Sequence, residues 1–285
     1  MIKPSMSTER VGVEGASREI MNSASNEPIE RRMTVAHGLV RSFEGQPGVI
    51  GAIVHGSSIR PYADEASDVD IAVVVEDGAL AAVAMGGVHQ KHWEGGRRIA
   101  DLSFYERSVF AAPISDFERF RATHARILFD REGALAILLA ELATLPARVV
   151  ADRMRVHYFE VTSLASKIVA AERRTKRDAA RLLTAQLVLC AARLLFLSKN
   201  AWPSPVSWMF EELELLGIPA PLTAALQAVL EAPTAKTLRV LRGTLDEYLL
   251  SCGATFVGDP VALLDWIYET PDGLRAAAQW GLALG

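Results

Sequence analysis

The spacing of apolar side chains changes partway along the chain, and this change constrains the fold more than any other feature. Two short runs rich in β-branched residues, 49–55 and 69–75, have the length and composition of buried strands. After Pro146 the sequence is rich in Ala, Leu and Arg, with apolar residues at helical spacing. We therefore expect an α+β fold, in which a mixed sheet is followed by an all-helical domain.

Local signals predict the other elements. A helix is expected after Pro28, ending before Gly45 and Pro47, and a last short strand at 127–129. Runs 88–93 and 97–105 flank a glycine-containing loop and predict a hairpin. Beyond Pro146, helices are expected at about 147–172, 176–198, 205–216, 221–231, 234–250 and 260–283. The predicted organisation is a flexible leader at 1–27, a mixed-sheet domain at 28–146 and a helical domain at 147–285.

Charge and hydropathy exclude several classes of protein. The formal net charge is -4 over 285 residues, so the chain lacks the dense Lys and Arg that long nucleic acid requires. The N-terminal residues have no continuous apolar run typical of a secretory signal. The longest apolar stretch, 182–197, is interrupted by Gln186 and Arg193 and is shorter than the roughly 20 residues that span a bilayer. We expect a cytoplasmic protein that does not interact with membranes.

The two cysteines, Cys190 and Cys252, have no nearby histidine cluster in the sequence. Neither a zinc site nor a disulfide framework can be derived from them. Buried thiols in a reducing cytosol are the expected reading.

The segment from residue 61 to 90 is acidic and lacks any cation. It contains six acids and no Lys or Arg, so a cation from elsewhere should compensate it. Asp68 and Asp70 have the i, i+2 spacing that places side chains on one face of a strand. Two such carboxylates repel each other unless a cation lies between them, and Mg²⁺ favours carboxylate oxygens together with substrate phosphates. The pair therefore predicts a magnesium site.

Residues that suit a phosphate group lie just before this pair. Gly56 has no Cβ, so a triphosphate can approach its backbone, and Ser57 offers a hydroxyl and an amide. Arg60 adds a planar guanidinium group. Asp101, flanked by apolar residues in the predicted hairpin, is a candidate third carboxylate that binds metal or accepts the proton of an attacking group.

The order of these residues resembles the nucleotidyltransferase superfamily of DNA polymerase β. An apolar-Gly-Ser turn is followed by Asp-x-Asp and then by an Asp between apolar residues. The segment GSSIRPYADEASDVDI is similar to the aminoglycoside and lincosamide nucleotidyltransferases, and ILFDREG at 127–133 extends the likeness. A weaker similarity at 195–213 is to the helical domain on the substrate side of such proteins.

This resemblance implies a nucleotidyltransferase fold and a role for each matching residue. Gly56 and Ser57 would hold the β and γ phosphates, and Asp68 and Asp70 would bind one or two Mg²⁺ ions. Asp101 would be a metal ligand or general base. The implied reaction transfers a nucleoside monophosphate, AMP from ATP, to a hydroxyl group of a small molecule such as an antibiotic.

Two other functions stay open at this point: nucleotidylation of a protein side chain, and a non-catalytic module that senses a nucleotide or binds a partner. The sequence does not give the acceptor, the preferred base or the oligomeric state, and a homodimer remains open. Further residues have a structural explanation that we favour over a functional one; they are His55, the basic group at 173–181, Glu160, Lys199, Trp202 and Trp208.

Overall fold

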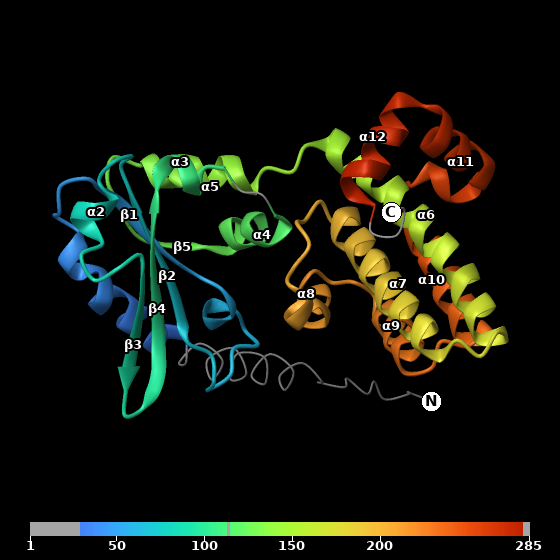
Figure 1. Cartoon of the computed structure of the whole chain (residues 1–285), viewed down its shortest axis with the longest axis horizontal. Coiled ribbons are helices and arrows are strands. Elements are labelled where there is room, and N and C mark those ends of the chain that lie inside the picture. Colours follow the sequence, from blue (N-terminus) through green and yellow to red (C-terminus); the bar gives the residue numbers. More distant parts are fainter. Residues whose placement is uncertain (1–28, 113–114, 282–285) are drawn as a thin grey trace, which may run out of the picture. The chain divides into compact units, whose positions relative to one another are not determined.

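The computed structural model describes residues 29–112 and 115–281 (Figure 1). The expected leader at 1–27 lies outside the described residues. The chain divides into two compact units. The first comprises the described part of Met1–Pro113 together with Arg121–Leu142, and the second comprises that of Ile114–Phe120 together with Ala143–Gly285. Because the first contains a mixed sheet and the second is helical, the predicted fold class is confirmed.

The sheet of the first unit has five strands in the order β3-β4-β2-β1-β5. Strands β2 and β4 are parallel, and the other neighbouring pairs are antiparallel. Four of the strands are those expected from the two β-branched runs and the hairpin, with ends that differ by at most one residue, and the fifth is the expected short strand. Their bounds are β1 Val49–His55, β2 Val69–Val75, β3 His89–Glu94, β4 Arg97–Glu106 and β5 Arg126–Asp130.

Both faces of the sheet are covered, and β2 shows how. Its residues Ile71 and Val73 pack with Ala36 and Val40 from the helix at 29–40, which the sequence predicts. The alternate residues Ala72 and Val74 point to the other face, where they pack against further helices. These are α3 (Arg107–Phe110), the C-terminal end of α4 (Asp116–His124) and α5 (Ala134–Ala143). Because both faces are buried, β2 is apolar along nearly its whole length.

The helical unit is built around the long helices α6 (Ala147–Arg173) and α7 (Arg177–Ser198), which pack along each other. Further helices complete its core; they are α8 Met209–Leu215, α9 Ala220–Glu231, α10 Ala235–Ser251, α11 Pro260–Glu269 and α12 Pro271–Trp280. The prediction of one helix at 260–283 was wrong. The side chain of Thr270 accepts a hydrogen bond from the backbone N–H of Gly273, and Pro271 begins the new helix, so the chain stops α11 and starts α12 at this point.

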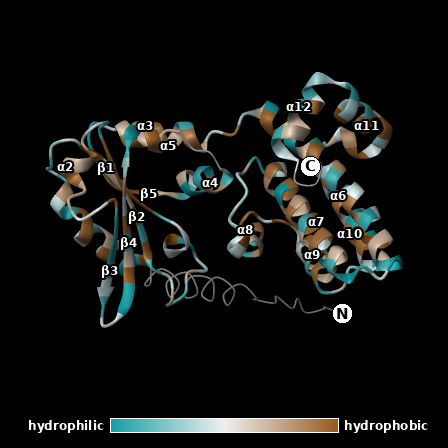
Figure 2. Cartoon of the chain, viewed as in Figure 1, coloured by the Kyte–Doolittle hydropathy of each residue, from teal (hydrophilic) through white to brown (hydrophobic). Residues whose placement is uncertain are grey.

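Two helical stretches are long and apolar enough to cross a membrane by length and composition alone, Ala134–Arg173 and Arg177–Ser198. Hydrophobic residues occur along much of α7 in Figure 2. Of its most apolar window, 61% is buried inside the structure, as in the core helix of a soluble protein, compared with 28% for the first stretch. One or two such helices are weak evidence for membrane insertion.

Candidate functional site

Three carboxylates converge where β2 begins. Asp68 immediately precedes β2, and Asp70 is its second residue. In the parallel pairing of β2 with β4, Asp70 lies opposite Asp101. In the antiparallel pairing of β2 with β1, Asp70 lies opposite His55. Ligand oxygens of Asp68, Asp70 and Asp101 all lie within 4.8 Å of one another. We call these three residues the acidic triad; they are the predicted metal ligands, and the sheet brings them together.

The triad concentrates negative charge in a partly buried position. Burial, followed by the negative charges of Asp68 and Asp101, raises the pKa of Asp70 to about 6. The guanidinium group of Arg98 opposes this rise. Its Nε lies 2.7 Å from Asp68 Oδ2, and its Nη1 lies 3.2 Å from Asp101 Oδ2. Arg98, which lies in the neighbouring strand β4, is therefore one cation that compensates the negative charge of segment 61–90.

The oxygens of the triad suit a divalent cation. Asp68 Oδ2 and Asp101 Oδ1 are buried and accept no hydrogen bond within the part of the chain that the structure describes. Asp68 Oδ2 has its ion pair with Arg98, which is close but lacks hydrogen-bond geometry. A buried carboxylate oxygen that accepts no hydrogen bond, such as Asp101 Oδ1, is costly, and a cation coordinated by it removes that cost. Three clustered carboxylates offer the hard oxygen ligands that Mg²⁺ prefers, so the residues present fit this metal.

Gly56 follows the last residue of β1 in a conformation that side chains rarely adopt. Its φ is 81° and its ψ is -165°. A Cβ at this position would collide with Oδ2 of Asp70. The absence of a side chain thus allows the Asp70 carboxylate to lie against the backbone, and the same open backbone is what the sequence predicts for phosphate contact.

The other predicted residues surround this turn. Ser57 begins the 3-10 helix Ser57–Ile59 directly after Gly56. Arg60 follows that helix, and its Nη1 lies 3.2 Å from Nδ1 of His124. His55 ends β1 and is buried; burial first, and the charge of Arg121 second, lower its pKa well below the usual value. His55 is therefore neutral at pH 7, in agreement with its structural reading.

Arg98 is the site residue that the sequence analysis missed. In a regular strand Arg98 and Asp101 would point to opposite faces, because their separation is odd. The register between β3 and β4 shifts here: His92 pairs with Ala100, whereas Trp93 pairs with Arg98. This bulge at Ile99 places Arg98 on the face of Asp101. The glycine loop beside Arg98 predicts a hairpin, but it does not predict the pairing register of the two strands. No sequence signal therefore identifies Arg98.

The weaker candidates lie in the helical unit. Glu160 is on α6, where its carboxylate contacts His157 and Cys190. Trp202 is buried, and its Nε1 donates a hydrogen bond to the carbonyl oxygen of Ala143, as expected of a packing residue. The expectation of two buried thiols was half wrong, because Cys190 is buried and Cys252 is exposed.

Among known proteins, similarity to this chain is found only in comparisons with solved structures. No family model matches the chain, and no curated protein is similar to it. Among solved structures, a nucleotidyltransferase-like protein from Exiguobacterium sibiricum 255-15 is similar to it over 78% of this chain and 77% of that one. The identity is 17% and the TM-score is 0.43. A likeness of this size does not establish function, which must be argued from the site residues.

Proposed function

We propose that this protein is a magnesium-dependent nucleotidyltransferase that moves a nucleoside monophosphate, AMP from ATP, to a hydroxyl group of a small molecule. The observation that carries the proposal is the acidic triad with its buried oxygens that accept no hydrogen bond. With the triad ionised, three carboxylates and Arg98 sum to -3 + 1 = -2. One divalent cation neutralises this charge, and a nucleoside triphosphate is the substrate that most often accompanies Mg²⁺.

Each residue has a role in this reaction. Asp68, Asp70 and Asp101 would hold Mg²⁺, which supplies positive charge to the phosphate oxygens of the bound nucleotide. Gly56 leaves its backbone open to the triphosphate, and Ser57 offers a hydroxyl donor to a phosphate oxygen. Asp101 would act chiefly as a metal ligand, and the alternative role of its carboxylate is to take the proton of the acceptor hydroxyl. Transfer of this kind depends on positioning and charge and needs no covalent nucleophile.

The cost of burying Asp70 favours an enzyme over a non-catalytic binding module. Its raised pKa means that the ionised form is disfavoured in the folded protein. A module without a cation ligand would be more stable with an uncharged side chain at position 70. The presence of three clustered acids is consistent with a bound metal, and the metal would offset the cost of burying them.

The acceptor, the nucleotide and the location belong to the proposal as well. We expect a small-molecule acceptor, with an antibiotic as the first class to examine because of the sequence resemblance. A protein side chain is the alternative acceptor. We expect ATP as the donor, the cytoplasm as the location, and no interaction with membrane or long nucleic acid. A homodimer would be compatible with this activity.

The experiment uses nucleotides labelled with ³²P on the α-phosphate. The full chain is incubated with each nucleotide, Mg²⁺, and either a panel of aminoglycosides and lincosamides or a cell lysate. We expect label from ATP on a small molecule, and no transfer from ATP labelled on the γ-phosphate. Asp68→Asn and Asp70→Asn should abolish transfer, whereas Glu76→Gln, which changes an exposed acid just beyond the opposite end of β2, should not. Label on protein bands identifies the alternative acceptor, and equal transfer by Asp70→Asn would refute the site.

A further inference from the structure

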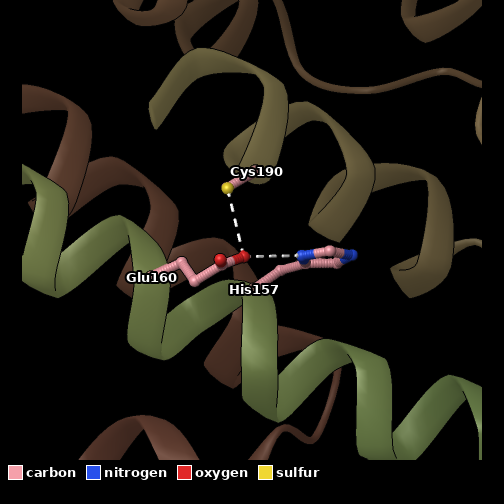
Figure 3. A group of neighbouring side chains, drawn as sticks. All are labelled: His157, Glu160 and Cys190. Atoms are coloured by element: carbon pink, nitrogen blue, oxygen red, sulfur yellow. Dashed lines mark hydrogen bonds and ion pairs between the residues drawn. The ribbon is translucent and has the colours of Figure 1, made fainter. Parts of the chain in front are cut away.

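A second group of metal-binding side chains lies inside the helical unit, in residues that the proposed reaction does not use. His157 and Glu160 are one turn apart on α6, and Cys190 faces them from α7 (Figure 3). All three side chains are buried: the exposed fractions are 0% for His157, 1% for Glu160 and 0% for Cys190. Two long helices thus enclose an imidazole, a carboxylate and a thiol in the core of the unit.

Two of the distances among these groups are close to those in the coordination shell of a zinc ion. Nδ1 of His157 lies 3.2 Å from Oε2 of Glu160, and Sγ of Cys190 lies 3.3 Å from the same oxygen. The ligand atoms of all three residues lie within 4.8 Å of one another. Usual zinc bond lengths at a tetrahedral angle separate nitrogen from oxygen, and oxygen from sulfur, by about 3.3 to 3.6 Å. The side chains therefore need only small shifts to hold one ion.

Hydrogen bonds within the group leave part of it unsatisfied. Both His157 and Cys190 approach one oxygen of Glu160, and a thiol is a weak donor. Nε2 of His157, on the side of the ring away from Glu160 (Figure 3), is buried and has no hydrogen-bond partner within the described residues, and a metal bound at Nδ1 does not contact it. Burial lowers the pKa of His157, so the ring is neutral, which is the form that binds metal ions.

We propose that His157, Glu160 and Cys190 bind a zinc ion that fastens α6 to α7. Nitrogen, sulfur and oxygen ligands together select zinc over magnesium or calcium, which take oxygen ligands alone. Burial and the charge of Glu160 raise the pKa of the Cys190 thiol, which Arg193 opposes, so the metal-free thiol keeps its proton and zinc binding releases it to solvent. The +2 charge of the ion then balances the Glu160 carboxylate and the Cys190 thiolate. Three protein ligands leave one tetrahedral position for a water molecule, which is the ligand number of catalytic zinc sites, whereas most structural sites have four protein ligands. This site contributes stability to the helical unit and is separate from the acidic triad.

Metal content and cobalt spectroscopy test this site in the full chain. The Asp70→Asn background is used throughout so that the triad cannot account for bound metal. Protein refolded with stoichiometric zinc and then desalted should contain about one zinc ion per chain, because ligand residues enclosed in a core bind metal as the unit folds. Refolding with Co²⁺ should give the strong near-ultraviolet absorption of a cobalt–thiolate bond, which an all-oxygen site cannot give.

Two cysteine variants provide the matched comparison. Cys190→Ser should lose the cobalt–thiolate absorption and most of the zinc, whereas Cys252→Ser, which changes the exposed thiol, should keep both. If Cys190→Ser fails to fold, the Asp70→Asn protein with both native thiols still tests the proposal, through its zinc content and its cobalt–thiolate absorption. Zinc well below one equivalent, or cobalt bound without thiolate absorption, would overturn the proposal. Equal metal in Cys190→Ser and Cys252→Ser would overturn it as well.

Discussion

At the scale of single residues, the ionisation of Asp70 links the site to the stability of the sheet unit. Burial and two neighbouring carboxylates raise its pKa from 3.8 to about 6. The folded protein therefore binds a proton more tightly than the unfolded chain between these values. The resulting loss of stability is absent below pH 3.8, grows as the pH rises, and is complete above pH 6.

Asp70→Asn should therefore stabilise the metal-free protein at neutral pH. This rise in the pKa of Asp70 corresponds to at most about 3 kcal/mol, since the side chain is partly exposed to solvent. Calorimetric unfolding in EDTA at pH 8 and pH 4 measures the effect. The variant should be more stable than wild type at pH 8, and the difference should shrink toward pH 4. A variant equally destabilised at both pH values would contradict this assignment.

Gly56 is the second residue whose identity the site requires. Gly56→Ala should cost on the order of 1–3 kcal/mol from backbone strain and should also displace the Asp70 carboxylate, so that metal affinity falls. Gly78→Ala is the matched control, because its φ is +86° but no atom lies within 4 Å of its added Cβ. Mn²⁺ titration by electron paramagnetic resonance should show weak binding for Gly56→Ala and normal binding for Gly78→Ala. Equal affinities would show that Gly56 does not position Asp70.

At the scale of elements, Asp130 joins strand β5 to helix α5. Its Oδ1 accepts a hydrogen bond from the backbone N–H of Leu135 at 3.0 Å, and its Oδ2 accepts one from that of Ala136 at 2.8 Å. Asp130→Ala should cost about 1 kcal/mol through loss of these bonds at the helix start, and Asp130→Asn should cost less. Urea denaturation measures both. No loss in Asp130→Ala would mean that the carboxylate does not cap α5.

Elements marked by strong local patterns could be predicted from the sequence. Strands β1 and β2 have the predicted bounds because two buried faces require continuous β-branched residues. Helix α5 was not predicted, since its sequence ALAILLAELA has no polar face and follows directly on a strand. The break between α11 and α12 depends on one cap at Thr270, which a continuous helical pattern hides.

The three carboxylates of the site could be predicted from the sequence because the local pattern places each of them at a strand. Asp68 and Asp70 stand in one short segment, and apolar neighbours place Asp101 in another strand of the sheet. Arg98 reaches the triad through a bulge, which depends on pairing between strands. The buried group at Cys190 was missed because its partners lie on another helix, far away in the sequence. Contacts made by tertiary packing leave no local pattern.

At the scale of the whole molecule, the two units are not two continuous halves of the sequence. Residues Ile114–Phe120 belong with the helical unit, although sheet strands precede and follow them. Phe120 packs in the core of that unit, and Asp116 makes a bidentate contact with it: Nη1 and Nη2 of Arg153 lie 2.9 Å and 2.5 Å from the two carboxylate oxygens of Asp116. Arg153 is 1% exposed, so its charge depends on this partner.

Asp116→Ala should therefore destabilise the helical unit strongly. Removing one partner of a buried ion pair leaves an uncompensated charge, and the expected cost is about 3 kcal/mol. Asp178→Ala is the control, because the ion pair of Asp178 with Arg181 is exposed and should contribute less than about 1 kcal/mol. Calorimetric melting of the full chain compares the two. Similar small losses in both variants would show that Asp116 does not stabilise the unit.

The central claim is that the acidic triad holds a divalent cation together with a nucleoside triphosphate. Isothermal titration with the α,β-methylene analogue of ATP tests it directly, because binding requires neither turnover nor a known acceptor. We expect the wild-type chain and Glu76→Gln to bind the analogue in Mg²⁺ but not in EDTA. Asp70→Asn should bind it at least about tenfold more weakly, a loss of about 1.4 kcal/mol. Equal binding in Mg²⁺ and EDTA, or unchanged binding by Asp70→Asn, would contradict the account.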